Sequence, residues 1–188
     1  MEITSAQFVQ GIVGPSDILH NDTPQIAFVG RSNAGKSSLL NSLTGKNKLA
    51  ITSKTPGRTK EINLFNINNT HYFLDLPGYG YARASGETKQ KLGELIAWYL
   101  FESNTDPTVV LLVDAVVGPT KDDLNMLQDL MDDKKRIVVV ANKIDKIKPS
   151  KLHKRLKELT QEFNGFRLIP YSSLTGVGKD ELLVELLQ

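Results

Sequence analysis

The sequence predicts an α/β fold with three layers, in which helices cover both faces of a mostly parallel, six-stranded sheet with one antiparallel strand. Short apolar runs alternate with amphipathic segments along most of the chain, as in successive βα units. One early pair of runs is separated only by Asn68-Asn69-Thr70, which predicts a hairpin and accounts for the antiparallel strand. The 188 residues, of which 40% are hydrophobic and 23% charged, suit one globular domain.

Each expected strand is a short apolar run bounded by turn residues, and the strands span residues 25–29, 61–67, 71–75, 108–113, 136–141 and 166–171. Each expected helix has apolar residues three or four positions apart, and the helices span residues 37–43, 87–101, 120–131 with Thr120 as N-cap, 151–163 and 179–187. Residues 1–24 are weakly patterned, and we interpret them as an N-terminal extension to a domain over residues 25–188. In such sheets ligands bind beyond the carboxyl ends of the strands, so the loops after Val29, Asp75, Val113, Ala141 and Tyr171 are candidate sites.

Several classes of protein are excluded or disfavoured by composition. The chain has no cysteine, which excludes disulfides, Cys-ligated zinc, iron–sulfur clusters and a cysteine nucleophile. No apolar run approaches the roughly 18 residues of a membrane span, and the first residues do not form a basic, apolar leader. We therefore expect a cytoplasmic protein without membrane insertion, and we expect a monomer.

The charges are unevenly distributed although the net charge is only +2. Residues 102–133 contain eight acidic residues and one lysine, whereas residues 134–157 contain ten basic residues and one acidic residue. Within the helix 151–163 the basic residues lie off the apolar stripe and are expected to face solvent; they are Lys151, Lys154, Arg155 and Lys157. A solubilising face and an RNA-binding face are both open interpretations. No motif for sequence-specific RNA readout is visible, and no DNA partner is expected.

The loop between the first strand and the first helix matches the pattern G-x-x-x-x-G-K-S in the context that the pattern requires. Backbone N–H groups of such loops surround phosphates at a helix N-terminus, where the helix dipole favours an anion. Lys36 is expected to bind the β- and γ-phosphates and to act in catalysis, and Ser37 is expected to ligate Mg²⁺. The predicted phosphate-binding residues are Gly30, Arg31, Ser32, Asn33, Ala34, Gly35, Lys36, Ser37 and Ser38.

The loop after the strand 71–75 begins with a D-x-x-G pattern, formed by Asp75, Leu76, Pro77 and Gly78. A carboxylate at this strand end can hold Mg²⁺ through water, and the Gly78 N–H can meet the γ-phosphate. The pattern alone is weak, because Asp and Gly are common turn residues. Its place after the hairpin and downstream of the phosphate loop makes it informative.

Two later loops predict recognition of guanine. Asp145 is acceptor-only when ionised, so it can accept both N–H donors on one edge of guanine, which adenine lacks. Asn142 is expected to brace neighbouring loops and the stem of Lys143 to pack on the purine, while N–H groups after the last strand meet the guanine O6. The predicted base-binding residues are Asn142, Lys143, Ile144, Asp145, Tyr171, Ser172 and Ser173.

The long polar loop before the hairpin contains Thr55-Pro56-Gly57-Arg58-Thr59. A threonine here can complete the Mg²⁺ shell only when a γ-phosphate is present, which would make the loop a nucleotide sensor. Thr59 is the predicted ligand beside Ser37, because it adjoins a strand, and Thr55 is the alternative. The predicted nucleotide contacts in this segment are Gly57, Arg58, Thr59, Lys60 and Glu61.

These motifs, in this order, resemble those of translation-factor-type GTPases, and the stretch Asp75-Leu76-Pro77-Gly78-Tyr79-Gly80-Tyr81-Ala82 is similar to the EngB/YihA/YsxC family. The lead-in Ile3-Thr4-Ser5-Ala6 also resembles that family. The resemblance implies a P-loop NTPase G domain that binds GTP or GDP with Mg²⁺. It also implies a GTPase switch in assembly of the large ribosomal subunit, with that subunit or its precursor, RNA and proteins included, as partner. The family is further associated with cell division and septation, so a nucleotide-gated scaffold for division proteins, with incidental hydrolysis, is the alternative.

Two residues bear on the rate of hydrolysis. Many GTPases have a glutamine after the D-x-x-G glycine to orient the attacking water, and here that position is Tyr79. Slow turnover without a partner or ion is therefore expected, with the Tyr79 ring packed beneath its loop. Asn33 resembles a residue that binds K⁺ in some GTPases, and the sequence equally fits an asparagine that tolerates a left-handed turn.

Overall fold

The computed structural model describes residues 2–50, 61–80, 86–163 and 165–188. The strands are β1 (Ala6–Ile12), β2 (Gln25–Gly30), β3 (Ile62–Ile67), β4 (His71–Asp75), β5 (Thr108–Asp114), β6 (Ile137–Asn142) and β7 (Leu168–Pro170). The helices are α1 (Lys36–Thr44), α2 (Gly86–Ala97), which continues as a π-helix over Trp98–Glu102, α3 (Lys121–Asp132), α4 (Pro149–Glu162) and α5 (Lys179–Leu186). Short 3₁₀ turns span Asp17–His20 and Ile144–Lys146.

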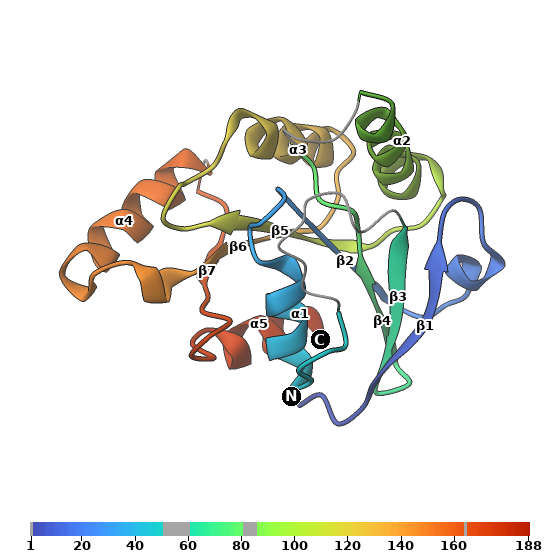
Figure 1. The fold of residues 1–188 in the computed structure, drawn as a ribbon, viewed down its shortest axis with the longest axis horizontal. Helices are drawn as coiled ribbons and strands as arrows, with labels where there is room; N and C mark the ends of the chain where they lie inside the picture. Colours follow the sequence, from blue (N-terminus) through green and yellow to red (C-terminus); the bar gives the residue numbers. More distant parts are fainter. Residues whose placement is uncertain (1, 51–60, 81–85, 164) are drawn as a thin grey trace.

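The strands form one sheet in the order β1-β3-β4-β2-β5-β6-β7. β3 is antiparallel to both of its neighbours, while the pairs β4–β2, β2–β5, β5–β6 and β6–β7 are parallel. Helices α2, α3 and α4 cover one face and α1 and α5 cover the other (Figure 1). The predicted three-layer class, with a single strand running against the rest, is therefore confirmed.

The central strands are buried on both faces, which explains why they read as continuous apolar runs. Along β2, Ala27 and Val29 belong to the core beneath α2, α3 and α4, whereas Ile26 and Phe28 belong to the core beneath α1 and α5. Each of these four side chains is at most 2% exposed. Such packing fixes the strand register, because a shift by one residue would exchange the two faces.

The sheet has seven strands instead of the expected six, because residues 6–12 pair with β3 as an edge strand. Ala6 and Ile12 are buried, whereas Phe8 is 54% exposed. An edge strand packs fewer side chains against the core, so the sequence of β1 has little apolar alternation. Its backbone hydrogen bonds to β3 hold it in the sheet. The boundary placed at residue 24 remains a prediction.

Local signals set the ends of several other elements. The hairpin turn uses Asn68 and Asn69, both with positive φ, as a type I′ connection requires. Thr120 caps α3 in a reciprocal capping box with Asp123. In the described part of the chain, no helix combines the length and the apolar character needed to cross a membrane.

Candidate nucleotide-binding site

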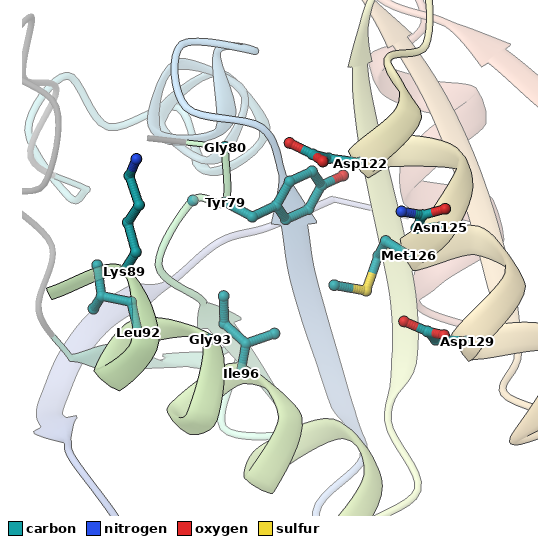
Figure 2. Close-up of a pocket in the computed structure, with 11 residues that line it drawn as sticks. Tyr79, Gly80, Lys89, Leu92, Gly93, Ile96, Asp122, Asn125, Met126 and Asp129 are labelled. Carbon is teal, nitrogen blue, oxygen red and sulfur yellow. The ribbon is translucent and has the colours of Figure 1, made fainter. Parts of the chain in front are cut away.

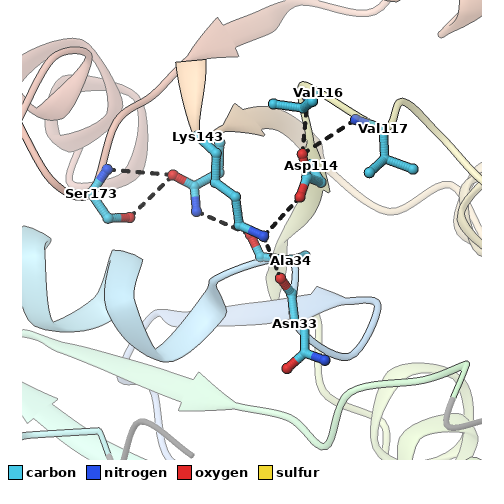
Figure 3. A network of polar contacts seen from close by, with 8 residues as sticks. Asn33, Ala34, Asp114, Val116, Val117, Lys143 and Ser173 are labelled. Atoms are coloured by element: carbon cyan, nitrogen blue, oxygen red, sulfur yellow. Dashed lines mark hydrogen bonds and ion pairs between the residues drawn. The ribbon is translucent and has the colours of Figure 1, made fainter. Parts of the chain in front are cut away.

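The loops after β2, β4, β5, β6 and β7 leave the sheet at the carboxyl ends of parallel strands and are linked to one another by polar contacts. Figure 3 shows contacts among the loops after β2, β5, β6 and β7. The structure thus brings the predicted phosphate loop and both predicted base loops to one edge of the sheet.

The phosphate loop is shaped by two glycines with little room around them. Gly35 has φ of 99°, and a Cβ there would collide with the Asn142 side chain. A Cβ on Gly30 would lie 2.7 Å from the carbonyl oxygen of Leu112 in β5. Helix α1 then begins at Lys36, and its N-cap residue, Gly35, has no side chain to accept from the first N–H groups of the helix. A helix start of this kind suits an anion.

Lys36 and Asp75 form a buried ion pair, in which the Lys36 ammonium donates to the Asp75 carboxylate. Their side chains are 9% and 3% exposed. The pair forms because β2 and β4 are neighbours and Phe28 is in register with Asp75. Ser37, the next residue of α1, is half-buried, and Ser38 is exposed. A cationic and an anionic group thus lie together beside the phosphate loop.

The D-x-x-G loop is tied directly to the phosphate loop. The N–H of Tyr79 donates to the Gly30 carbonyl at 3.3 Å, and the N–H of Ser32 donates to the Tyr79 carbonyl at 2.9 Å. Leu76 and Pro77 are buried and hold the loop against the core. A movement of the loop at residues 78–79 would therefore be transmitted to the start of the phosphate loop.

The Tyr79 side chain packs under its loop, as expected. Its hydroxyl donates to the Asp123 carboxylate at 2.7 Å, on the buried side of the α3 N-terminus. Burial raises the pKa of Tyr79 well above its usual value, and the charges of Asp123 and Asp122 raise it further. The Tyr79 hydroxyl is therefore neutral, and it donates its proton to a hydrogen bond with Asp123 of α3.

Asn142 is the central brace of the site. It is 1% exposed, and its amide donates to the Ala34 carbonyl at 3.1 Å. Its side-chain oxygen accepts the Ser173 hydroxyl at 3.1 Å and the Ser173 N–H at 3.4 Å. One buried side chain therefore joins the phosphate loop to both loops expected to bind guanine, in the bracing position that the sequence predicts.

Lys143 makes a second bridge, from a left-handed backbone with φ of 67°. Its ammonium donates to the Asn33 carbonyl at 2.6 Å and to Asp114 at 2.7 Å (Figure 3). Burial alone would raise the pKa of Asp114, but the hydrogen bond and charge of Lys143 and the N–H groups of Val116 and Val117 outweigh burial and lower it. These contacts hold the Lys143 ammonium between the phosphate loop and the end of β5.

The carboxylate predicted to read guanine, that of Asp145, is held by the last loop. The Ser172 hydroxyl donates to Asp145 at 2.6 Å, while the rest of Asp145 is exposed. The N–H of Ile144 donates to the Tyr171 carbonyl at 3.3 Å, which joins the two base loops. Tyr171 is buried, and its hydroxyl lies 2.9 Å from that of Ser42 on α1. Asp145 therefore has a fixed orientation and free acceptor capacity.

Other predicted site residues are placed differently. Asn33 is exposed and has φ of 69°, a left-handed backbone that asparagine tolerates. The Glu61 carboxylate lies against Gly11 of β1, and its predicted nucleotide contact remains a prediction. Thr55 and the predicted contacts Gly57, Arg58, Thr59 and Lys60 lie outside the described residues, as do Tyr81 and Ala82.

Asp114 and Arg155 are site-supporting residues that the motifs did not identify. Asp114 ends β5, one of the strands whose carboxyl end was a candidate position. Arg155 was expected in solvent and is instead half-buried, since its guanidinium donates to the Ala115 carbonyl at 2.9 Å and pairs with Glu158 and Glu162. It holds the loop after β5, and helical periodicity cannot reveal such a contact.

The fold and the loops together define a P-loop GTP-binding domain. The chain matches the family described as 50S ribosome-binding GTPase over residues 25–143 and the family described as elongation factor Tu GTP binding domain over residues 104–188. A probable GTP-binding protein EngB from Clostridium kluyveri is 43% identical over 97% of this chain and 94% of its own length. A protein of the same name from Gemmatimonas aurantiaca is 46% identical over 88% of this chain and 82% of its own.

Solved structures agree. A probable GTP-binding protein engB has a TM-score of 0.68 at 26% identity and covers 87% of this chain and 96% of its own. Era in complex with MgGDPNP and nucleotides 1506–1542 of 16S ribosomal RNA has a TM-score of 0.72 at 32% identity, over 88% of this chain and 56% of that one. The chain belongs to the EngB family of GTP-binding proteins, and it is a GTPase.

Proposed function

We propose that this GTPase is a nucleotide-dependent switch in assembly of the large ribosomal subunit, which it binds as a cytoplasmic monomer in the GTP state. The observation that carries the proposal is the match over residues 25–143 to a family described as 50S ribosome-binding GTPases. The likeness to Era, whose structure contains ribosomal RNA, supports an RNA-bearing partner.

GTP binding in this site uses groups of the phosphate loop and of the predicted base loops. The N–H groups of residues 30–38 and the Lys36 ammonium bind the phosphates, and Asp145 accepts the guanine donors. Lys36 must then exchange its contact with Asp75 for the β- and γ-phosphates. Because Asp75 loses its cation in that exchange, a second cation beside it becomes favourable.

A magnesium ion fits this position. Among the described residues, Ser37 at the start of α1 offers a hydroxyl, and the Asp75 carboxylate is buried beside Lys36. Mg²⁺ prefers oxygen ligands and keeps several waters, so one hydroxyl and one carboxylate are a sufficient protein contribution. Bound there, the ion would neutralise charge on the phosphates, and Thr59 is our proposed additional ligand.

We propose that hydrolysis is slow without a partner. The Tyr79 hydroxyl is committed to Asp123, so residue 79 offers no amide to orient water. A K⁺ ion bound by Asn33 would supply the missing positive charge. The alternative is that Asn33 only forms the turn, which its left-handed backbone fits equally well. Phosphate release by the purified protein should therefore be faster in K⁺ than in Na⁺; equal rates would assign Asn33 to the turn alone, and rapid turnover in both would contradict slow hydrolysis.

The exposed basic face of α4 is our proposed contact to ribosomal RNA. Lys151, Lys154 and Lys157 are exposed, and among the described residues their one ion pair is a 4.0 Å contact from Lys154 to Glu158. Lysines held this loosely can pair with phosphates and release counterions, which makes binding dependent on salt.

Cosedimentation with purified ribosomal subunits tests the role. Binding to the large subunit or its precursor is expected with a non-hydrolysable GTP analogue and not with GDP. Changing Lys151, Lys154 and Lys157 to Gln should reduce the slope of log affinity against log salt by about two to three, while the same change at exposed Lys48 and Lys121 should not. Absence of ribosome binding in every state would refute the assembly role, leave the GTPase standing, and favour the division scaffold.

A further inference from the structure

A groove between α2 and α3 adjoins the end of the D-x-x-G loop and contains no residue of the phosphate loop or of the predicted base loops. Its volume is about 530 Å³, and it is lined by Gly78, Tyr79, Gly80, Lys89, Leu92, Gly93, Ile96, Asp122, Asn125, Met126 and Asp129. Figure 2 shows Ile96 and Leu92 rising from α2, Met126 reaching across from α3, and the Tyr79 ring at one end. The floor is therefore apolar and the far wall is polar.

The rim of the groove is predominantly acidic. Asp122 and Asp129 on α3 are exposed and flank the apolar floor, and Lys89 on α2 is the one lining cation among the described residues. The helix α3 ends at exposed Asp132, and the next residue, Asp133, is paired with Lys135 at 3.2 Å, so unpaired negative charge on this side of α3 is concentrated at the groove. A cationic partner is attracted to such a rim, whereas RNA phosphates are repelled.

Gly93 shapes the α2 wall of the groove. Glycine destabilises a helix interior relative to alanine, and Gly93 lies within α2. A Cβ at Gly93 would meet nothing within 4 Å, so packing within the described fold does not require the glycine. Its missing side chain leaves the wall of the groove open at the middle of α2.

We propose that the α2–α3 groove binds a segment of a protein partner in which lysines or arginines flank one apolar anchor side chain. The anchor enters over Leu92, Ile96 and Met126, and the cations pair with Asp122 and Asp129. A partner seated there contacts Tyr79, whose backbone is hydrogen-bonded to Gly30 and Ser32 in the phosphate loop. The affinity for the partner should therefore differ between the GDP and GTP states, and this part of the inference rests on the GTPase function.

The probe is a set of fluorescein-labelled ten-residue peptides, each with one Leu, Met or Phe between pairs of Lys or Arg. Counterparts replace the cations by Glu or the anchor by Gly. The full chain is titrated with each peptide in the GDP state and with a non-hydrolysable GTP analogue. Methyl NMR provides the location, because Met126 lines the groove and Met131, on the same helix, does not.

Cationic, anchored peptides are expected to bind, to shift the Met126 methyl signal, and to leave Met131 unshifted. Asp129→Asn should weaken binding about two- to five-fold, as for one exposed ion pair, while the control Asp132→Asn should not. Gly93→Met should fill the groove and weaken binding at least about ten-fold, whereas Gln90→Met, an exposed position on α2 outside the groove, should leave binding unchanged.

Several results would overturn the proposal. One is that no peptide binds at 1 mM (about −4 kcal/mol). Another is that the Glu counterparts bind as tightly as the cationic peptides. A third is that each variant and its control lose the same amount of peptide affinity. A concentration-dependent dimer that Gly93→Met abolishes would assign the groove to a second copy of this chain instead. Equal affinity in the two nucleotide states would refute the link through Tyr79. None of these results depends on ribosome binding.

Discussion

Replacing Asn142 by alanine tests the central contact of the site. The change removes two hydrogen bonds of 3.1 Å and one of 3.4 Å, and it leaves the Ala34 carbonyl, in a residue 4% exposed, without that donor. At about 1 kcal/mol for each good bond, and more for an acceptor left unpaired, we expect the free energy of unfolding to fall by about 2–4 kcal/mol. That is a large part of the stability of a typical domain.

Urea denaturation without nucleotide and with a chelator measures this loss directly, since bound nucleotide would add its own stabilisation. The thermal midpoint should fall by roughly 4–16 °C for a chain of this size. Asn125→Ala removes the same side chain from an exposed position on α3 and should change stability by about 0.5 kcal/mol or less. Equal effects of the two variants would refute the bracing role of Asn142, and a changed urea slope would point to an altered denatured state instead.

Three further predictions concern charged groups of the site. Lys36→Ala should weaken GDP binding by at least about 100-fold, because a charge-assisted contact to phosphate is lost; a small change measured with a fluorescent GDP would mean that the loop does not hold phosphates. Asp145→Asn should weaken GTP by roughly 100-fold in calorimetric titration, because one acceptor for guanine becomes a donor, and unchanged affinity would contradict the guanine assignment. The lowered pKa of Asp114 means that its pairing with Lys143 stabilises the fold above the ordinary carboxyl value of 3.8 and is lost as pH falls through the lower folded value. Stability should therefore decline less steeply below pH 3.8 in Asp114→Asn than in the parent, and parallel curves would show that the pair contributes nothing.

Much of the architecture followed from local pattern. The central strands are buried on both faces and therefore appear as apolar runs, and Thr120 caps α3 in the expected position. The β1 strand was missed, because an edge strand with Phe8 exposed lacks apolar alternation. The last strand is shorter than expected, Leu168–Pro170, since apolar character continues past the residues that pair with β6.

In the candidate site, too, some features were predictable from the sequence and others were not. The chain order of its loops and the predicted contacts to phosphate and guanine follow from contiguous motifs, because a short loop's backbone is set by its own glycines and polar residues. The pairing of Lys143 with Asp114 and the contact of Arg155 with Ala115 join segments far apart in the chain. No local pattern encodes those distances.

The sequence by itself determined the α/β class and the GTP-binding family, and it predicted the phosphate loop and the guanine contacts, since each depends on residue types at fixed spacing. Only the tertiary structure decided that Tyr79 bonds Asp123, that Asn142 joins three loops, and that a groove with an acidic rim lies between α2 and α3. These features depend on the order of strands in the sheet, because that order determines which loops and which helices become neighbours.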